Sequence, residues 1–148
     1  MTSMVNLTPF LLFDGNCAEA MAFYQSCLGG EVTITKLGDT PMGDQAPLEQ
    51  RQKVTYACLK GDGIELSATD WLHPTRFPRP GNTVAIFLQL DDDMKVQAIF
   101  DKLAVGADPD LLDDLRNMPF GTYGHLADRY GVHWFFRGAS RDGITSDD

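Results

Sequence analysis

The pattern of apolar and polar positions predicts two helices and eight strands in this chain of 148 residues. Each predicted strand is an apolar run or an alternation of β-branched and polar residues, and turn residues bound it. The predicted strands are Thr8–Phe13, Glu31–Leu37, Val54–Lys60, Gly63–Thr69, Thr83–Leu90, Leu111–Met118, Tyr123–Ala127 and Val132–Arg137. In chain order the elements are a strand, a helix and three strands, and then the same series again.

Two segments repeat apolar residues at helical spacing. The first follows Asn16, an expected N-cap residue with Glu19 three positions on, which is close to a capping box. It ends at the glycine pair 29–30, which supplies a left-handed stop. The second runs from Met94 to Ala104 after the three aspartates 91–93, whose carboxylates the helix macrodipole favours.

The two halves of the chain overlay with a single offset of 76 residues. This offset places Thr8 on Val84, Tyr24 on Phe100, and Gly30 on Gly106. One helix covers only one face of a four-stranded sheet, so each half should leave its other face uncovered. We therefore predict an α+β fold of two βαβββ modules, which form a curved sheet around a shared cleft. Ligand pockets tend to form where such modules meet.

The whole chain, residues 1–148, is expected to form a single domain. The first module covers about 8–71, the second about 83–137, and we expect the Gly-, Ser- and Asp-rich tail 138–148 to fray. The Pro-rich segment 72–82 is the linker between the modules. Eleven extended residues span roughly 30 Å. The modules can therefore pair within one chain or exchange between two chains.

Composition and charge exclude several classes of protein. A hydrophobic content of 43% is ordinary for a globular protein, and the net charge of −9, with basic residues scattered singly, argues against nucleic acid as a partner. The three cysteines form no CxxC pair, and the N-terminus has no signal-peptide pattern. No run of 18 apolar residues suits a membrane span. We therefore expect a cytoplasmic protein with reduced thiols.

Three stretches carry a resemblance to a known family. They are residues 12–24 with the Leu-Gly-Gly of 28–30, Leu66–Asp70, and Tyr123–Trp134. In these stretches the chain resembles the PhnB-like branch of the vicinal oxygen chelate superfamily. This is the glyoxalase/bleomycin resistance/dioxygenase superfamily, and the branch is also labelled 3-demethylubiquinone-9 3-methyltransferase-like. The resemblance implies the paired βαβββ fold and usually a homodimer. Because no Gly-rich loop follows a predicted strand, we expect neither a methyltransferase nor a bound cofactor.

The resemblance also implies positions for metal ligands, because metal-using members take them from the first and last strands of each module. In this sequence the four positions are Pro9, Glu65, Ala85 and Phe135. Only Glu65 can coordinate a metal, and a shift of two residues in the last strand adds no more than His133. A divalent ion needs three or four donor ligands. The sequence therefore predicts no superfamily-type metal centre.

Strand alternation selects two candidate catalytic residues. Ile64, Leu66 and Ala68 should face the helix, so that Glu65, Ser67 and Thr69 face the cleft. A carboxylate on a concave apolar surface suits a general base. If Trp134 packs under the helix, His133 points into the cleft opposite Glu65, and the pair can move a proton. The alternative is a partly solvated glutamate and a hydrogen-bonded histidine without chemistry.

Several other side chains are candidates for binding a ligand. Aromatic rings suit planar ligands, although such rings are also ordinary core residues. The candidates are Tyr56, Ser67, Trp71, Phe87, Tyr123, His125 and Phe135. We interpret Asp70 and Asp128 as turn-capping residues, and Cys17 as structural.

Three hypotheses for the function follow. The first is a metal-independent small-molecule binding protein of the bleomycin-resistance type, for which the acidic balance favours a cationic ligand. The second is a lyase- or isomerase-like enzyme that uses Glu65 and His133. The third is a metal-dependent glyoxalase-type enzyme whose ligands lie elsewhere than this alignment puts them.

Overall fold

The computed structural model describes residues 5–139, which divide between residues 79 and 80 into two compact units. The first unit contains β1 (Phe10–Phe13), α1 (Cys17–Leu28), β2 (Glu31–Lys36), β3 (Val54–Gly61) and β4 (Ile64–Asp70). The second contains β5 (Ala85–Gln89), α2 (Asp93–Leu103), β6 (Leu112–Met118), β7 (Gly121–Ala127) and β8 (His133–Arg137). Each unit is thus a βαβββ module, which confirms the predicted fold class. The predicted element bounds hold to within one or two residues.

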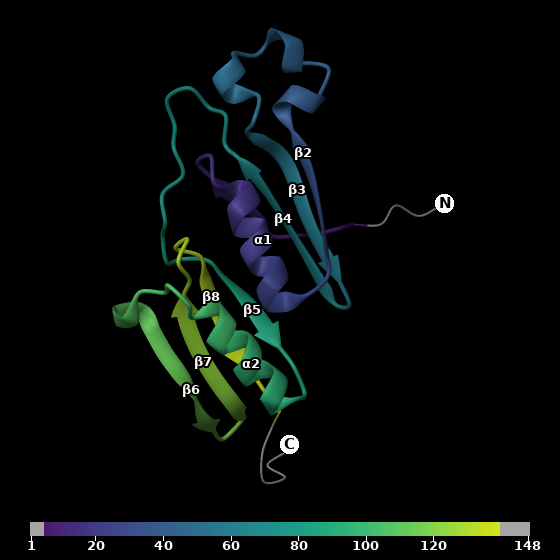
Figure 1. The fold of residues 1–148 in the computed structure, drawn as a ribbon. Helices are drawn as coiled ribbons and strands as arrows, with labels where there is room; N and C mark the ends of the chain where they lie inside the picture. The colour runs from purple at the N-terminus through teal and green to yellow at the C-terminus, as the bar shows by residue number, and fades with distance from the viewer. Residues whose placement is uncertain (1–4, 140–148) are drawn as a thin grey trace. The chain divides into compact units, whose positions relative to one another are not determined.

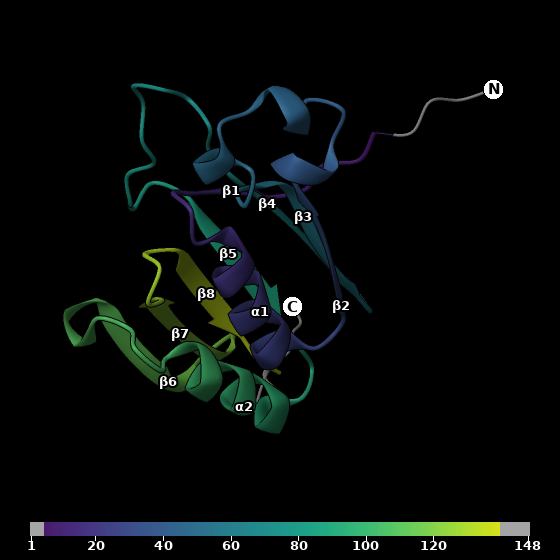
Figure 2. The same ribbon diagram turned by 45° about the horizontal axis from the view of Figure 1, so that its top comes forward.

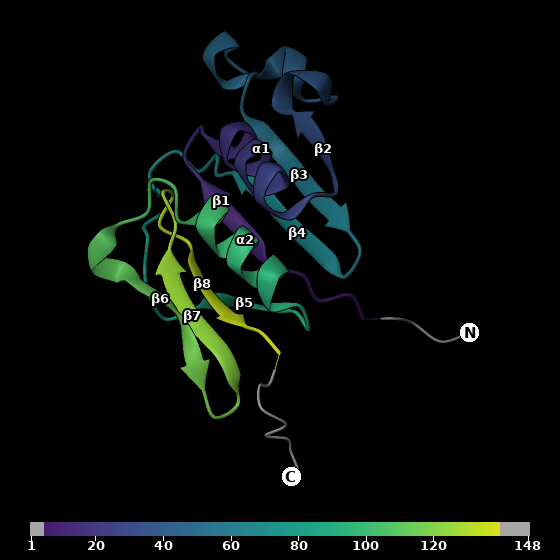
Figure 3. The ribbon, with the colours of Figure 1, turned by 60° about the horizontal axis from the view of Figure 1, so that its bottom comes forward.

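Both units have the same sheet topology. The strand order is β1-β4-β3-β2 in the first sheet and β5-β8-β7-β6 in the second. In each sheet the first strand runs parallel to the last, and the other neighbours are antiparallel. The helix carries the chain from one edge strand to the other and packs on one face of its sheet, as Figure 1 shows for α1 and Figure 3 for α2.

The register of the first sheet fixes which side chains meet α1. Leu66 pairs with Leu59 and Ala68 with Ala57, and all four side chains are buried. They pack with the buried side of α1, which includes Met21. Burying these apolar side chains stabilises the unit. The residues between them, Glu65 and Ser67 among them, face the other way, as the alternation predicts. We call the face of each sheet opposite its helix the open face of that unit.

The second sheet follows the same rule. Trp134 is 1% exposed and Phe136 is fully buried, and the Phe136 ring lies 5.0 Å from that of Phe100 on α2 in an edge-on arrangement. The predicted packing of Trp134 under the helix is confirmed. Because side chains alternate, His133 and Phe135 lie on the open face of the second unit.

The start of α1 differs from the prediction. Asn16 is the N-cap residue, as predicted, but its side chain does not make the capping hydrogen bond expected of it. The carboxylate of Asp70 takes its place: Oδ1 accepts from the backbone N–H groups of Gly15 and Cys17, both at 2.9 Å. Its other oxygen accepts from the N–H of Val54 at 2.9 Å. Asp70 therefore ties β4 to the start of α1 and the start of β3.

The aspartates before α2 do cap that helix. The side chain of Asp92 accepts from the backbone N–H groups of Met94 at 3.0 Å and Lys95 at 3.2 Å. These bonds satisfy two of the donors that a helix start leaves free. The predicted placement of carboxylates at this helix start is confirmed.

The internal repeat needs one correction. The offset of 76 fits the helices, because Tyr24 and Phe100 are both buried on the sheet side. In the first strands the helix-side residues are Leu11 and Phe13 in one unit but Ile86 and Leu88 in the other, an offset of 75. The connection from this strand to the helix is one residue longer in the second unit. As a result, Ala85 on the open face corresponds to Phe10, and not to Pro9.

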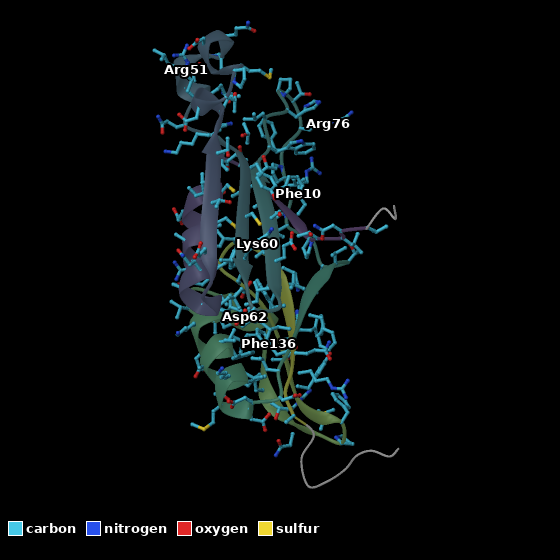
Figure 4. The ribbon with its side chains drawn as sticks, turned by 90° about the vertical axis from the view of Figure 1, so that its right-hand side faces the viewer. Phe10, Arg51, Lys60, Asp62, Arg76 and Phe136 are labelled. Carbon is cyan, nitrogen blue, oxygen red and sulfur yellow. The ribbon has the colours of Figure 1, made fainter. Side chains whose placement is uncertain are left out.

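The connections outside the sheets are ordered by local hydrogen bonds. Between β2 and β3 the chain makes three short 3₁₀ turns, η1 (Leu37–Asp39), η2 (Gly43–Gln45) and η3 (Leu48–Gln50), at one end of the first sheet (Figure 2). Arg51 precedes β3 and Asp62 follows it, at opposite ends of the strand (Figure 4). The 3₁₀ turn η4 (Pro109–Leu111) precedes β6.

Over residues 5–139, no helix has the length and apolar character that crossing a membrane requires.

Candidate functional site

The open face of the second unit carries most of the candidate residues, in three rows across its strands. The first row is Ala85, His133 and Ala127; the second is Phe87, Phe135, His125 and Asp113; the third is Gln89, Arg137, Tyr123 and Arg116. The structure thus brings His133, Phe87, Tyr123, His125 and Phe135 together on one face. One end of this face is lined with alanine and imidazole, the middle is aromatic, and the other end carries two guanidinium groups.

A chain of polar contacts joins the first row to the second. His125 Nε2 lies 2.9 Å from His133 Nδ1, a hydrogen bond between two imidazoles whose rings are stacked. The other nitrogen of His125, Nδ1, lies 3.4 Å from Oδ2 of Asp113. The His125 side chain is 15% exposed and that of Asp113 is 69% exposed. Asp113, His125 and His133 therefore form a continuous polar chain from solvent into the open face.

Aromatic rings extend this chain along the sheet. Phe135 lies 4.5 Å from the His125 ring and 5.9 Å from the Tyr123 ring, centroid to centroid. Tyr123 meets the edge of Phe120 at 5.4 Å, and the guanidinium of Arg137 lies 5.4 Å from the Phe120 centroid. We call the rings of Phe120, Tyr123, His125, His133 and Phe135 the aromatic wall. Ring separations of 4.5–7 Å are those of favourable aromatic contacts, and such a surface suits a planar ligand.

The open face of the first unit holds the remaining candidates in two groups. The hydroxyl of Tyr56 is hydrogen-bonded to that of Ser67 at 3.2 Å. Glu65 pairs across the sheet with Lys60 and is half-buried, and within residues 5–139 its carboxylate receives no hydrogen bond or ion pair. Trp71 lies beyond the end of β4, where its ring is 5.8 Å from that of His73. Tyr56 and Ser67 are thus brought together, whereas Trp71 lies apart from them.

The predicted pairing of Glu65 with His133 has no contact within either unit, because Glu65 belongs to the first and His133 to the second. Their pairing and the shared cleft stay predictions. The partner that the structure gives His133 is His125, from the adjacent strand. The two histidines are diagonal neighbours, because Ala127 pairs with His133 and His125 pairs with Phe135. The signal in the sequence was the tight turn 128–131 followed by strand alternation, which puts both side chains on one face of adjacent strands.

The residues present do not fit the metal centre of metal-using superfamily members. In the first unit Phe10 of β1 pairs with Ser67 of β4, and in the second Ala85 pairs with His133. In the first unit these open-face positions offer one hydroxyl, with the carboxylate of Glu65 two residues away on the same face, and in the second unit one imidazole. A divalent ion needs three or four donors, which these positions of neither unit supply by themselves. Over the part of the chain that the structure describes, His, Cys, Asp and Glu side chains form no group of three or more suited to a metal ion.

Two buried aspartates bond to the protein itself. Asp128 accepts from the N–H groups of Tyr130 at 2.8 Å and Val132 at 3.1 Å, and from the indole N–H of Trp134 at 2.9 Å. Asp70 holds three backbone N–H groups in the same way. Both carboxylates therefore stabilise turns and connections, which agrees with their interpretation as capping residues.

Cys17 is expected to be unreactive in the native protein. Burial, and secondarily the charge of Asp70, raise the pKa of the Cys17 thiol from 9.0 to about 12. Since the thiolate is the reactive form, alkylation of Cys17 by iodoacetamide should be at least about tenfold slower in the folded than in the unfolded protein. Above pH 9 the unfolded state loses this proton before the folded state does, so stability should fall there. Mass spectrometry of timed labelling measures the rate. Equal rates would contradict the structural role.

The fold is shared with solved structures of the superfamily that the sequence resembles. A glyoxalase/bleomycin resistance protein/dioxygenase from Nocardioides superposes with a TM-score of 0.53 at 16% identity, over 99% of this chain and 92% of that one. Two βαβββ modules with open sheet faces define this class of protein. The chain belongs to the family described as 3-demethylubiquinone-9 3-methyltransferase, whose model matches residues 5–136. This is the PhnB-like family of the superfamily.

Three relatives are similar over almost their whole length. Protein YjdN of Escherichia coli K12 is 26% identical, with 86% of this chain and 91% of YjdN covered. The structure of PA1353 from Pseudomonas aeruginosa has a TM-score of 0.80 at 27% identity, covering 93% of this chain and 99% of that one. A PhnB protein from Bacillus cereus, termed a putative 3-demethylubiquinone-9 3-methyltransferase, has a TM-score of 0.70 at 26% identity, covering 91% and 100%.

The methyltransferase in the family's description does not suit this fold. Each four-stranded sheet contains a single parallel pair, β1 with β4 and β5 with β8, and is otherwise antiparallel. A Rossmann-type methyltransferase binds its cofactor at the carboxyl ends of a doubly wound parallel sheet, in a Gly-rich loop between strand and helix. The connections from β1 to α1 and from β5 to α2 contain no such loop.

Proposed function

We propose that this protein binds a planar, aromatic small molecule without a metal, on the open face of its second unit. The observation that carries the proposal is the aromatic wall, in which rings follow one another at centroid distances of 4.5–5.9 Å from His133 to Phe120. Phe87, beside Phe135 in the same row, is 52% exposed. Exposed aromatic surface on a rigid sheet is typical of sites that bind flat ligands.

The charges of the third row favour an anionic group at that end of the ligand, whereas Asp113, the one acid of the three rows, lies beside His125 in the second row. Arg116 and Arg137 flank Tyr123 in the third row, and both side chains are exposed. Guanidinium groups bind carboxylates and phosphates in two-pronged geometry. The whole chain carries a net charge of −9, which by itself favours a cation. A bound molecule meets the nearby charges first, because charges beyond about 10 Å are screened by salt.

The length of the face favours a ligand with two rings. His133 and Arg137 are four residues apart on β8, a span of about 13 Å at roughly 3.3 Å per residue. Because the Arg137 side chain is long, the distance between the His133 ring and the guanidinium group, which a ligand must span, can be shorter than this backbone separation. A fused bicyclic acid such as a naphthoate therefore suits the face better than a single ring. Family membership supports a small-molecule role, while the homodimer and the cytoplasmic location stay predictions.

Fluorescence titration with 6-methoxy-2-naphthoate tests this function. We expect saturable binding that weakens at least about tenfold in Phe135→Ala and in Phe87→Ala, because each removes stacking area beside the ligand. Met94→Ala is the matched control: Met94 is 83% exposed and belongs to α2, on the opposite side of the same sheet. Binding should be unchanged in this variant and in protein treated with a chelator.

Two results would contradict the proposal. If neither substitution on the open face alters the affinity, the ligand does not lie on the aromatic wall. If chelation abolishes binding, the site depends on a metal. Circular dichroism of each variant shows whether the fold is intact, and Phe87→Ala is the more robust variant, since Phe87 is already half exposed.

A further inference from the structure

We infer that Asp113 and His125 hold His133 in one tautomer, so that its Nε2 atom accepts a hydrogen bond from a hydroxyl group of the bound ligand. The ligand class is then a hydroxyaryl acid with two fused rings. This inference rests on the proposed function and adds to it a ligand hydroxyl group, which His133 in the first row of the open face would bind.

The hydrogen bond between the imidazoles requires one proton between the two facing nitrogens. His125 Nε2 and His133 Nδ1 are 2.9 Å apart, which is a normal hydrogen-bond distance. A neutral imidazole carries its proton on one nitrogen and presents a lone pair on the other. The tautomers of the two rings are therefore coupled. If His125 donates from Nε2, its Nδ1 carries no proton; if His133 donates from Nδ1, its Nε2 carries no proton.

Asp113 decides which ring donates. An ionised carboxylate only accepts hydrogen bonds, and Oδ2 of Asp113 lies 3.4 Å from Nδ1 of His125. This contact favours a proton on Nδ1 of His125, because a lone pair there would face the negative charge. His125 Nε2 is then bare and accepts the proton of His133 Nδ1. His133 Nε2, at the far side of its ring, is left with a lone pair.

The exposed side of the His133 ring is the side of β5. Its two cross-strand neighbours in the first row are Ala85 and Ala127, the smallest side chains of the face. Ala85 is exposed and His133 is half-buried, whereas Ala127 is only 2% exposed. The His133 imidazole, at one end of the aromatic wall, is therefore open to a ligand on the side of Ala85.

The three rows together specify the chemistry of the ligand. The first row presents a hydrogen-bond acceptor at His133, the second row aromatic surface at Phe135, and the third row cations at Arg116 and Arg137. The complementary molecule carries a hydroxyl donor at one end, fused rings in the middle and an acidic group at the other end. A hydroxynaphthoate has this order of groups.

A matched pair of probes isolates the hydroxyl group. The wild-type protein should bind 6-hydroxy-2-naphthoate at least about tenfold more tightly than 6-methoxy-2-naphthoate, because the methyl ether leaves the His133 acceptor without a donor. In His133→Phe, which keeps a ring at this position, the two probes should bind with equal affinity. In Asp113→Asn the ratio of the affinities for the hydroxy and methoxy probes should fall. In Asp114→Asn, which changes the adjacent exposed acid, this ratio should stay as in the wild type.

A spectroscopic readout tests the positioning role directly. Long-range ¹H–¹⁵N correlation spectra at alkaline pH should show both His125 and His133 with the proton on Nδ1. His73 is an internal reference of the opposite tautomer, because its Nδ1 accepts from the N–H groups of Thr75 at 3.1 Å and Arg76 at 3.0 Å. In Asp113→Asn we expect the His133 signals to move towards a mixture of tautomers, with His73 unchanged.

The outcomes separate this inference from the proposed function. If both probes bind the wild-type protein equally, or if His133 carries its proton on Nε2, the inference is wrong and the proposed function stands. If neither probe binds, both are wrong. Tighter binding of the hydroxyl probe that depends on His133 and Asp113, with the expected tautomers, supports both.

Discussion

Replacing Asp70 with alanine should lower the free energy of unfolding by about 3–5 kcal/mol, the largest effect expected of any single side chain discussed. The Asp70 carboxylate is 2% exposed and accepts three backbone hydrogen bonds, each 2.9 Å long. Alanine leaves the N–H groups of Gly15, Cys17 and Val54 without this acceptor. Each buried donor that loses its partner costs about 1–3 kcal/mol, which applies to Cys17 and Val54, whereas Gly15 is exposed and water can satisfy its N–H group. Urea denaturation followed by circular dichroism measures the loss.

Two further variants make this prediction specific. Asp70→Asn keeps the shape of the side chain but turns one acceptor oxygen into an N–H donor, which must then face a backbone donor, so most of the loss should remain. Asp62→Ala removes an exposed carboxylate from the turn between β3 and β4 and should change stability by less than about 0.5 kcal/mol. If Asp70→Ala unfolds within about 1 kcal/mol of the wild type, the carboxylate does not join these segments.

The faces of the strands could be predicted because alternation is a local property of the chain. Leu66 and Ala68 are buried with the helix, and Trp134 packs under α2, as their places in alternating segments require. The fold class was predicted from the series of a strand, a helix and three strands, which occurs twice along the chain. The family was predicted from the resemblance. None of these steps needed contacts between residues far apart in the sequence.

The start of α1 could not be predicted from local sequence. Asn16 and Glu19 match a capping box, but the hydrogen-bond acceptor comes from Asp70, which is 53 residues from Cys17 along the chain. A carboxylate at the end of a parallel strand reaches this position only once β4 has paired with β1. The pairing of those strands, and not the composition of either, determines which side chain caps the helix.

For the candidate site, too, local sequence predicted which residues take part, whereas the contacts between them depend on strand pairing. His133, Phe135 and His125 were selected as candidates from alternation and aromatic character. The hydrogen bond between the two histidines depends on the exact register of β7 against β8, and the contact with Asp113 depends on the irregular pairing of β6 with β7. Three side chains that were separate, or unremarked, in the sequence thereby become one connected group.

The second large effect is expected at Gly30, where β2 begins against the end of β3. Gly30 has φ of +92°, and a Cβ atom built there would lie 2.5 Å from the backbone oxygen of Lys60. A left-handed conformation costs a residue with a side chain about 1–2 kcal/mol, and overpacking against rigid backbone adds about 1–3 kcal/mol. Gly30→Ala should therefore lower the free energy of unfolding by about 3 kcal/mol or more.

The preceding residue supplies a matched control for this prediction. Gly29 has φ of +79°, and no atom lies within 4 Å of the Cβ that alanine would add. Gly29→Ala should therefore cost only the conformational part, about 1–2 kcal/mol. The difference between the two variants, measured in one urea series, isolates the contact with the Lys60 carbonyl. Equal losses would mean that the edge strand β2 yields to the added methyl group, since only a displaced strand can relieve a contact with backbone.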